Sequence, residues 1–283
     1  FRLGGGGVAT ELILNTEFSS IVINSGSGND TIDLRETASG TAVNVDAGSG
    51  DDLIRITNLV GSRDVDTFLR GNITVSGGTG TDSIQIFDQD DGVGGDTYTL
   101  SSTVFNKGGR TIAYSNLASM LILASDQDST FNINGTSSLT ALSITGGSGN
   151  ETFNIINTSN TISVNGGAGN DTFNVGGGDI DSNLASGITL NGGSGTDRLV
   201  FDDTTDGSGS DTYALTSTQL TKGIRIVNYA AFAQMVINAS NQNSTFEVSS
   251  LTTPTTINGG TGNERFNINA ANASLVINAG SGD

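Results

Sequence analysis

The sequence of 283 residues contains no cysteine, no histidine and no tryptophan, and only one proline. Without cysteine and histidine the chain can form no disulfide bond, no thiolate nucleophile and no imidazole–thiolate zinc site. No run of about 18 consecutive apolar residues occurs, so a helix that crosses a membrane is not expected. These absences leave carboxylates as the main groups that could carry chemistry.

Basic residues are also scarce. Lysine and arginine together number 11 against 29 aspartates and glutamates, which gives a formal net charge of −18 at pH 7. Nucleic acids and anionic membranes would be repelled by such a chain. The sequence therefore indicates cations as partners of its charged groups and argues against nucleic acid.

The chain does contain a repeated phrase, in which a glycine-rich turn ends in an acidic residue and leads into a strand. Full copies lie at residues 25–30, 47–52, 77–82, 146–151, 166–171, 192–197 and 259–264, and a truncated copy lies at 279–283. A fixed repeat of this length is typical of a solenoid, which grows by adding coils to one continuous core. Function is then expected on a repeated surface and not in a single pocket.

Alternation on both sides of each turn predicts the fold. After Glu151, for example, the second and fourth residues are Phe153 and Ile155, and before the turn of Asp171 the pair Ile162 and Val164 alternates in the same way. A period of two predicts strands with one buried face. We therefore expect an all-β, right-handed parallel β-helix or β-solenoid, with about 12 coils of roughly 20 to 26 residues each.

Two rows of side chains should stack along such a coil. Aromatic residues at equivalent positions predict an internal ladder that provides much of the stability. Asparagines six residues before the turn carboxylates predict a ladder of amide hydrogen bonds. The aromatic row comprises Phe131, Phe153, Phe173, Phe246 and Phe266, and the amide row comprises Asn24, Asn165, Asn191, Asn238, Asn258 and Asn278.

A longer repeat is laid over the short one. The segment DTYTLSST at residues 96–103 returns as DTYALTST at residues 211–218. No linker or change of composition separates the copies. The sequence thus predicts one elongated solenoid domain over residues 1–283, a segment of a longer repeat array, with cassettes at about 1–95, 96–210 and 211–283.

Two acidic insertions precede the recurring segment, at residues 88–96 and 202–211. A loop of carboxylates and glycines can wrap a cation. The more common outcome for such a loop is exposure to solvent, and the sequence leaves both interpretations open.

The copy at residues 166–174, Gly-Gly-Ala-Gly-Asn-Asp-Thr-Phe-Asn, resembles the nonapeptide of the hemolysin-type, or RTX, calcium-binding repeats. The resemblance covers each turn and not the whole chain. It implies Ca²⁺ held between neighbouring turns by turn carbonyls and by the carboxylate at the sixth position. The metal ligands implied in this way are Asp30, Asp52, Asp82, Glu151, Asp171, Asp197 and Glu264.

Electrostatics favours the same ion. Carboxylates aligned on adjacent coils would lie about 5 Å apart and repel by roughly 3 kcal/mol per pair at an effective dielectric constant of 20. Calcium accepts the carboxylate and carbonyl oxygens that such turns offer. The chain departs from the family in carrying the motif at one corner only, in using serine in the turns at 125–129 and 240–244, and in using glutamate twice. The alternative is that the turn carboxylates only accept backbone hydrogen bonds.

A structural role accounts for more of the sequence than catalysis does. Enzymes built on parallel β-helices, such as those that act on polysaccharides, need a singular cluster of reactive groups, and here the repeat returns without one. The expected function is a non-enzymatic stalk, sheath or filament at a bacterial cell surface or outside the cell, with calcium at the turns. Its expected partners are calcium and further coils of its own or a sister chain. The alternative is an adhesin module that binds a glycan or a sister chain.

Overall fold

The computed structural model describes residues 10–11, 18–57, 60–92, 94–137, 139–185, 187–207 and 209–282. Phe1 and Asp283, which bound the predicted domain, lie outside these residues, as do Val93 and Ser208 of the acidic insertions. The described chain forms two compact units, and each is taken by itself below.

Unit 1 comprises the described residues up to Thr130 together with Thr136–Gly149. It contains one short helix and twelve strands. Its elements are β1 (Thr10–Glu11), β2 (Ser20–Asn24), β3 (Thr31–Leu34), β4 (Ala42–Asp46), β5 (Leu53–Ile56), α1 (Val65–Phe68), β6 (Ile73–Ser76), β7 (Ser83–Phe87), β8 (Thr97–Leu100), β9 (Val104–Lys107), β10 (Arg110–Ser115), β11 (Ser119–Leu123) and β13 (Ala141–Thr145).

Unit 2 comprises Phe131–Gly135 and the described residues from Asn150 onward. Its elements are β12 (Thr130–Ile133, whose first residue belongs to unit 1), β14 (Thr152–Ile155), β15 (Thr161–Ala168), β16 (Thr172–Val175), α2 (Ile180–Asn183), β17 (Ile188–Ser194), β18 (Arg198–Asp202), β19 (Asp211–Leu215), β20 (Gln219–Lys222), β21 (Arg225–Ala230), β22 (Gln234–Asn238), β23 (Ser244–Val248), β24 (Thr255–Asn258), β25 (Glu264–Ile268) and β26 (Leu275–Asn278).

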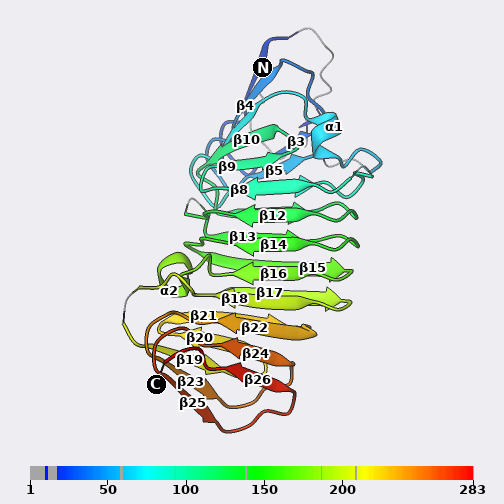
Figure 1. Ribbon diagram of the computed structural model, residues 1–283. Helices are drawn as coiled ribbons and strands as arrows, with labels where there is room; N and C mark the ends of the chain where they lie inside the picture. Colours follow the sequence, from blue (N-terminus) through cyan, green and yellow to red (C-terminus); the bar gives the residue numbers. More distant parts are fainter. Residues whose placement is uncertain are drawn as a thin grey trace. The chain divides into compact units, whose positions relative to one another are not determined.

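In each unit successive strands alternate between two sheets, so that a strand pairs with the strand two places further along the chain, as β3 does with β5 (Figure 1). Unit 1 has the strand orders β1-β3-β5-β7-β11-β13 and β2-β4-β6-β10-β9-β8. Unit 2 has β15-β17-β21-β20-β19-β23-β25 and β12-β14-β16-β18-β22-β24-β26. Apart from β9 and β20, the paired strands are parallel and in register, as for Ile32 with Ile54 and Ile54 with Ile84. The described chain is thus nearly all-β with mostly parallel sheets, which confirms the predicted class and fits a β-solenoid or β-helix.

One strand in each unit runs against the rest. In unit 1, β9 pairs antiparallel with both β8 and β10, and in unit 2, β20 pairs antiparallel with both β19 and β21. The chain therefore makes a three-stranded excursion within one coil before parallel winding resumes. A two-residue turn with positive φ at Gly108 and Gly109 reverses the chain between β9 and β10. The sequence had revealed the recurrence of residues 96–103 at 211–218, which contain β8 and β19, but not this reversal.

The aromatic ladder forms, but as two stacks in unit 2. Phe153 lies between Phe131 and Phe173, with ring centroids 4.8 and 4.6 Å away. In the other sheet Phe246 lies between Tyr213 and Phe266, at 4.9 Å from each. The single stack that the sequence predicted is wrong, because the β20 reversal places the later phenylalanines in the opposite sheet.

The amide ladder is confirmed where Asn258 donates to Asn238 at 2.9 Å and Asn278 donates to Asn258 at 2.8 Å. It does not include the oxygen of Asn165, which is buried without a hydrogen-bond partner. A second ladder that the sequence analysis missed runs through Asn132, Asn154 and Asn174, with bonds of 2.9 Å.

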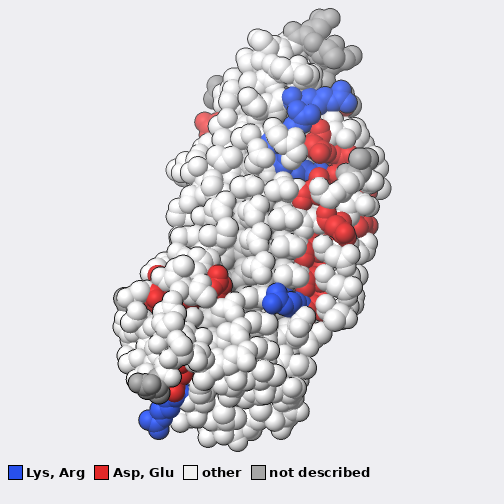
Figure 2. All heavy atoms as spheres, in the orientation of Figure 1, with Lys and Arg blue, Asp and Glu red and all other residues white. Residues whose placement is uncertain are grey.

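The two helices have four residues each and are capped by the side chains of Asp64 and Asp179. Neither has the length or the apolar character that a membrane span requires, and no other described segment is such a helix. Figure 2 shows a face on which uncharged atoms dominate and acidic and basic atoms lie in adjoining groups. Among the described residues, eleven aspartates and one glutamate are instead buried, so part of the acidic groups of the chain lies away from solvent.

Candidate functional site

Glycines shape the repeated turns. Gly48 and Gly50 have φ values of +96° and +124°, in the left-handed region that side chains rarely adopt. A Cβ atom on Gly48 would lie 2.0 Å from the carbonyl oxygen of Gly26 in the neighbouring turn. Turns therefore stack closely only when these positions are glycine, and this stacking brings the acidic residues that follow them into a column.

In unit 1 the column consists of Asp30, Asp52 and Asp82. The backbone N–H of Asp30 donates to Oδ1 of Asp52 at 2.7 Å, and that of Asp52 donates to Oδ1 of Asp82 at 2.9 Å. Asp52 and Asp82 are each only 1% exposed. The other carboxylate oxygen, Oδ2, is buried in all three residues and has no hydrogen-bond partner.

Unit 2 repeats the arrangement with Glu151, Asp171 and Asp197. The N–H of Glu151 donates to Oδ1 of Asp171 at 2.7 Å, and the N–H of Asp171 donates to Oδ1 of Asp197 at 2.8 Å. Oδ2 of Asp171 and of Asp197 is buried without a partner. The structure thus brings together six of the seven predicted ligands, in two columns of three.

The seventh residue, Glu264, stands apart because its register partner on the neighbouring strand is Ser244. Its turn also differs in backbone, as does the turn of Glu151. In these two turns the glycines at the second and fourth positions do not have the positive φ seen in the aspartate turns. Aspartate thus accompanies the left-handed turn and glutamate accompanies the other form, a distinction that the sequence pattern did not reveal.

Burial makes the carboxylates of Asp52 and Asp171 costly to ionise. Burial raises the pKa of Asp52, and the negative charges of Asp82 and Asp30 add to the effect, against a backbone hydrogen bond that lowers it. The pKa of Asp171 is raised by burial too, with a contribution from Asp197. A buried carboxylate oxygen without a partner needs either a proton or a cation to balance it.

Calcium fits this donor set in its chemistry. The free groups are carboxylate oxygens beside backbone carbonyls, the hard donors that Ca²⁺ prefers. Among the described residues, three groups of acidic side chains have oxygens within 4.8 Å of one another, and all three consist of aspartates outside the turns. A calcium ion in a turn column would therefore take one or two side-chain oxygens and complete its shell with carbonyls and water.

The converging aspartates surround a buried lysine in each unit. In unit 1 the Nζ atom of Lys107, which is fully buried, lies 2.5 Å from Asp91, 3.0 Å from Asp88, 3.2 Å from Asp66 and 3.3 Å from Asp96. Three of these four aspartates are themselves buried. We call these five residues lysine cluster 1.

Lysine cluster 2, in unit 2, has the same composition. The Nζ atom of Lys222, 1% exposed, lies 2.6 Å from Asp203, 2.7 Å from Asp206, 2.7 Å from Asp181 and 3.4 Å from Asp211. Both lysines end the reversed strand of their unit, and each is paired in register with a tyrosine of the preceding strand. The clusters therefore fasten the three-stranded excursions to the coil.

Tyrosine and backbone groups hold one aspartate of each cluster in place. The Tyr98 hydroxyl and the N–H of Val65 both donate to Asp88, and burial raises the pKa of Asp88 to about 6. Burial raises the pKa of Asp96 to about 7, and a hydrogen bond with Asp91 contributes. The surrounding carboxylates raise the pKa of Lys107 despite its burial.

Of the two interpretations of the acidic insertions, exposure to solvent is therefore wrong for the insertion residues that belong to the clusters, which are all buried: Asp88, Asp91, Asp96, Asp203, Asp206 and Asp211. Asp88 and Asp203 are fully buried, and their charge is met by a lysine of the same chain. The signal that could have revealed this is the recurrence of one lysine, Lys107 and Lys222, behind each acidic insertion. In a chain so poor in cations, a recurring lysine indicates a buried partner for recurring aspartates.

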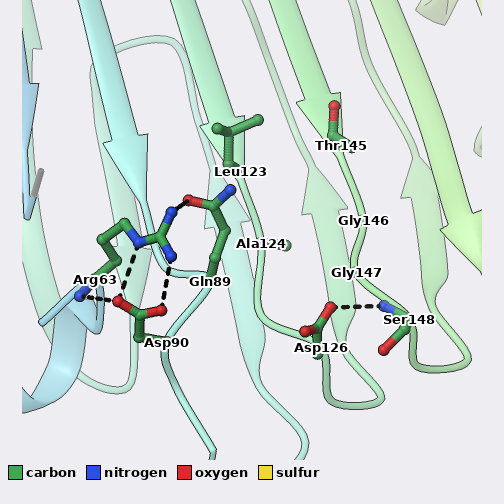
Figure 3. A pocket seen from close by; sticks show the side chains of 10 residues that line it. All are labelled: Arg63, Gln89, Asp90, Leu123, Ala124, Asp126, Thr145, Gly146, Gly147 and Ser148. Carbon is green, nitrogen blue, oxygen red and sulfur yellow. Dashed lines mark hydrogen bonds and ion pairs between the residues drawn. The ribbon is translucent and has the colours of Figure 1, made fainter. Parts of the chain in front are cut away.

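Unit 1 also has an open pocket of about 380 Å³ (Figure 3). On one side Arg63 binds Asp90 through two guanidinium nitrogens, at 3.0 and 2.8 Å, and this pairing lowers the pKa of Asp90 to about 2. On the other side Asp126 accepts the N–H of Ser148 at 3.1 Å. Leu123 contributes an apolar part of the lining.

Comparison of the chain with protein-family models gives no match, and comparison with curated proteins gives none either.

Proposed function

We propose that the protein is a non-enzymatic structural β-solenoid that binds calcium at its aspartate turns and acts outside the cell or on a bacterial cell surface. The observation that carries this proposal is the recurrence of buried Oδ2 atoms without hydrogen-bond partners at Asp52, Asp82, Asp171 and Asp197. A fold does not repeat such unfavourable groups without a compensating partner. Divalent calcium can compensate two neighbouring carboxylates at once.

The RTX-like motif supports calcium over other cations. In this proposal the coils wind right-handed and number about 12 across the whole chain. Calcium is abundant outside cells, so a solenoid that it stabilises becomes rigid only after export. The stacked, in-register strands supply stiffness, and the ions remove repulsion between neighbouring turns. A stalk, sheath or filament is the use that these properties suit.

The proposed calcium sites are the turns that end in aspartate, and this excludes Glu264 from the seven metal ligands predicted from the sequence. The columns Asp30–Asp52–Asp82 and Glu151–Asp171–Asp197 each offer neighbouring carboxylates. Glu264 faces serine in the adjacent coil and lacks a second acidic ligand. We therefore expect weak or no calcium binding there.

Calorimetric titration of calcium into chelator-treated protein tests the proposal. We expect saturable binding, with magnesium at the same concentration producing little heat, because Mg²⁺ requires a compact octahedral shell and releases water reluctantly. Absence of saturable calcium binding to the folded protein would refute the calcium part and leave a solenoid whose turns are held by backbone hydrogen bonds alone.

The pocket of Figure 3 supports a second candidate, an adhesin module that binds a glycan. Its polar groups, which include Asp126, Gln89 and the Arg63–Asp90 pair, lie beside the apolar Leu123, a combination that suits a sugar ring with hydroxyl groups on its edge. A glycan array would test this candidate. Binding that Asp126→Ala abolishes would support it, and an array without specific signals would exclude it.

A further inference from the structure

We propose that Lys107 and Asp91 are joined by an intramolecular amide bond, an isopeptide, and that Lys222 and Asp206 are joined in the same way. This inference does not depend on calcium, because the lysine clusters lie outside the turn columns. Each bond would form without an enzyme or cofactor, from side chains that the fold brings into contact.

The first argument is geometric. Nζ of Lys107 lies 2.5 Å from Oδ2 of Asp91, and Nζ of Lys222 lies 2.7 Å from Oδ2 of Asp206. All four side chains are at most 3% exposed. Groups held in this way react with effective concentrations on the order of 10⁵ to 10⁸ M. Exclusion of water also opposes hydrolysis of the bond once it has formed.

The second argument is the charge of the cluster. Each buried lysine faces four aspartates, three of them buried, so one positive charge meets up to four negative charges in a region that is largely closed to water. Burial of ions is costly even when they are paired. Conversion of one ammonium and one carboxylate into a neutral amide removes two of these charges. The dry interior therefore shifts the balance toward the amide, which in water would be opposed by ionisation of both groups.

The third argument is the presence of a proton carrier. Asp88 lies 3.0 Å from Nζ of Lys107, and its two oxygens are held by the Val65 N–H and the Tyr98 hydroxyl. Asp203 is held in the same way by Ile180 and Tyr213 in cluster 2. An aspartate whose pKa is raised to about 6 both accepts and returns a proton near neutral pH.

Distance and equivalent position decide which aspartate reacts. In cluster 1 the distances favour Asp91, at 2.5 Å from Nζ, over Asp88, at 3.0 Å. In cluster 2 Asp203, at 2.6 Å, and Asp206, at 2.7 Å, are equally close, and Asp206 is assigned as the reacting residue because it occupies the position equivalent to Asp91. The remaining buried aspartates, Asp96 and Asp211, lie beyond 3.2 Å from the lysine.

The reaction balances without an oxidant or a further reactant. The ammonium of Lys107 gives a proton to Asp88, and the free amine attacks Cγ of Asp91 in its protonated form. Asp96, which shares a proton with Asp91, provides that protonated form. As the C–N bond forms, the nitrogen passes its second proton to Asp96, which lies 3.3 Å from Nζ and thereby regains its acid form. Asp88 returns its proton to the departing hydroxyl, and the C–O bond breaks. One water leaves for each amide formed.

Such a bond would have a mechanical consequence. Lys107 ends β9, the reversed strand, whereas Asp91 lies in the segment between β7 and β8. The amide would close a covalent loop around the excursion and prevent it from peeling away under load. Cluster 2 would do the same for β20 in unit 2.

Mass spectrometry of the purified, denatured chain tests the proposal. We expect the intact mass to be lower than the sequence mass by two waters, and proteolysis to release two branched peptides, one joining Lys107 to Asp91 and one joining Lys222 to Asp206. Asp91 and Asp206 each precede glycine, a pair that can also lose water by closing a succinimide within the chain. Fragment spectra separate the two products, because a succinimide leaves the peptide linear.

Lys107→Arg provides the matched control, since it keeps the positive charge but removes the primary amine, while Lys222 in the same chain remains as an internal reference. We expect this variant to lack one water loss and to keep the second branched peptide. Asp91→Asn should yield the same final mass as the cross-linked wild type, because attack on the amide releases ammonia and forms the same bond. The proposal would be overturned if the folded wild-type protein had the full mass of its sequence, or if the loss of water were found only in linear peptides.

Discussion

Replacement of Asp52 by asparagine separates the two explanations of the turn columns. Oδ1 of Asp52 accepts the N–H of Asp30 at 2.7 Å, and an asparagine oxygen can accept the same bond. The change therefore removes the charge of the carboxylate and replaces its second oxygen, which is buried without a partner, by an NH2 group. In chelator we expect Asp52→Asn to raise the free energy of unfolding by about 1 to 3 kcal/mol, the usual cost of such a buried group.

In calcium the stability advantage of the variant should shrink by about 1.3 kcal/mol. A site filled at a hundredfold excess of calcium over Kd contributes about 2.7 kcal/mol to the free energy of unfolding. Loss of one charged ligand that weakens binding tenfold would reduce this contribution to roughly 1.4 kcal/mol. Urea unfolding followed by circular dichroism, at neutral pH with and without calcium, measures both quantities for the wild type and for the variant.

Asp51→Asn is the matched control. Asp51 is adjacent and exposed, its Oδ1 accepts the N–H of Thr81 at 2.8 Å, and asparagine occupies the same position in the turns of Asn29 and Asn170. The Asp51→Asn variant loses the same formal charge as Asp52→Asn, and we expect its free energy of unfolding to change by at most about 0.5 kcal/mol with or without calcium. If both variants kept the full calcium increment of the wild type, calcium binding by the turn carboxylates would be refuted.

Three further predictions concern the clusters, the turns and the core. Burial raises the folded-state pKa values of Asp88 and Asp96 to about 6 and about 7, above the ordinary 3.8, so the stability that they contribute is present below pH 4 and is lost as the pH rises toward 7. Urea unfolding in chelator should therefore give a lower unfolding free energy at pH 7.5 than at pH 4.5. A flat or rising profile would contradict this prediction. Gly193→Ala should lower the melting temperature, because its Cβ would lie 2.1 Å from a backbone carbonyl oxygen at a φ of +100°, whereas Gly207→Ala, with nothing within 4 Å, should not. Phe153→Ala should cost about 3 to 5 kcal/mol in the same assay, since the ring is fully buried between two others, and a loss below about 1 kcal/mol would show that the stack contributes little.

Much of the fold could be predicted from the sequence because a solenoid shows the same pattern of turns and strands in every coil. The alternation of apolar residues on both sides of each glycine turn predicted parallel, in-register strands, and the pairing of Phe153 with Phe173 confirms it. The reversed strands β9 and β20 could not be predicted in this way. Their residues alternate like those of any other strand, and alternation does not encode the direction in which a strand pairs.

The candidate site divides along the same line. The turn positions of Asp52 and Asp171 followed from the motif, but their burial and the free second oxygen depend on how closely successive turns stack. The lysine clusters were missed because the members of each come from three separate segments, which in unit 1 are α1, the acidic insertion and the end of β9. Only the folded excursion brings Lys107 against Asp66, which is far from it in the sequence.

Thermal unfolding followed by circular dichroism, in calcium, in magnesium and in excess chelator, tests the central claim most directly. Calcium that fills the turn columns should raise the melting temperature by several degrees for each kcal/mol of binding free energy, and magnesium should not reproduce the rise. A strand-rich melt with the same midpoint in all three conditions would contradict the account and would mean that the turn carboxylates are balanced by protons alone.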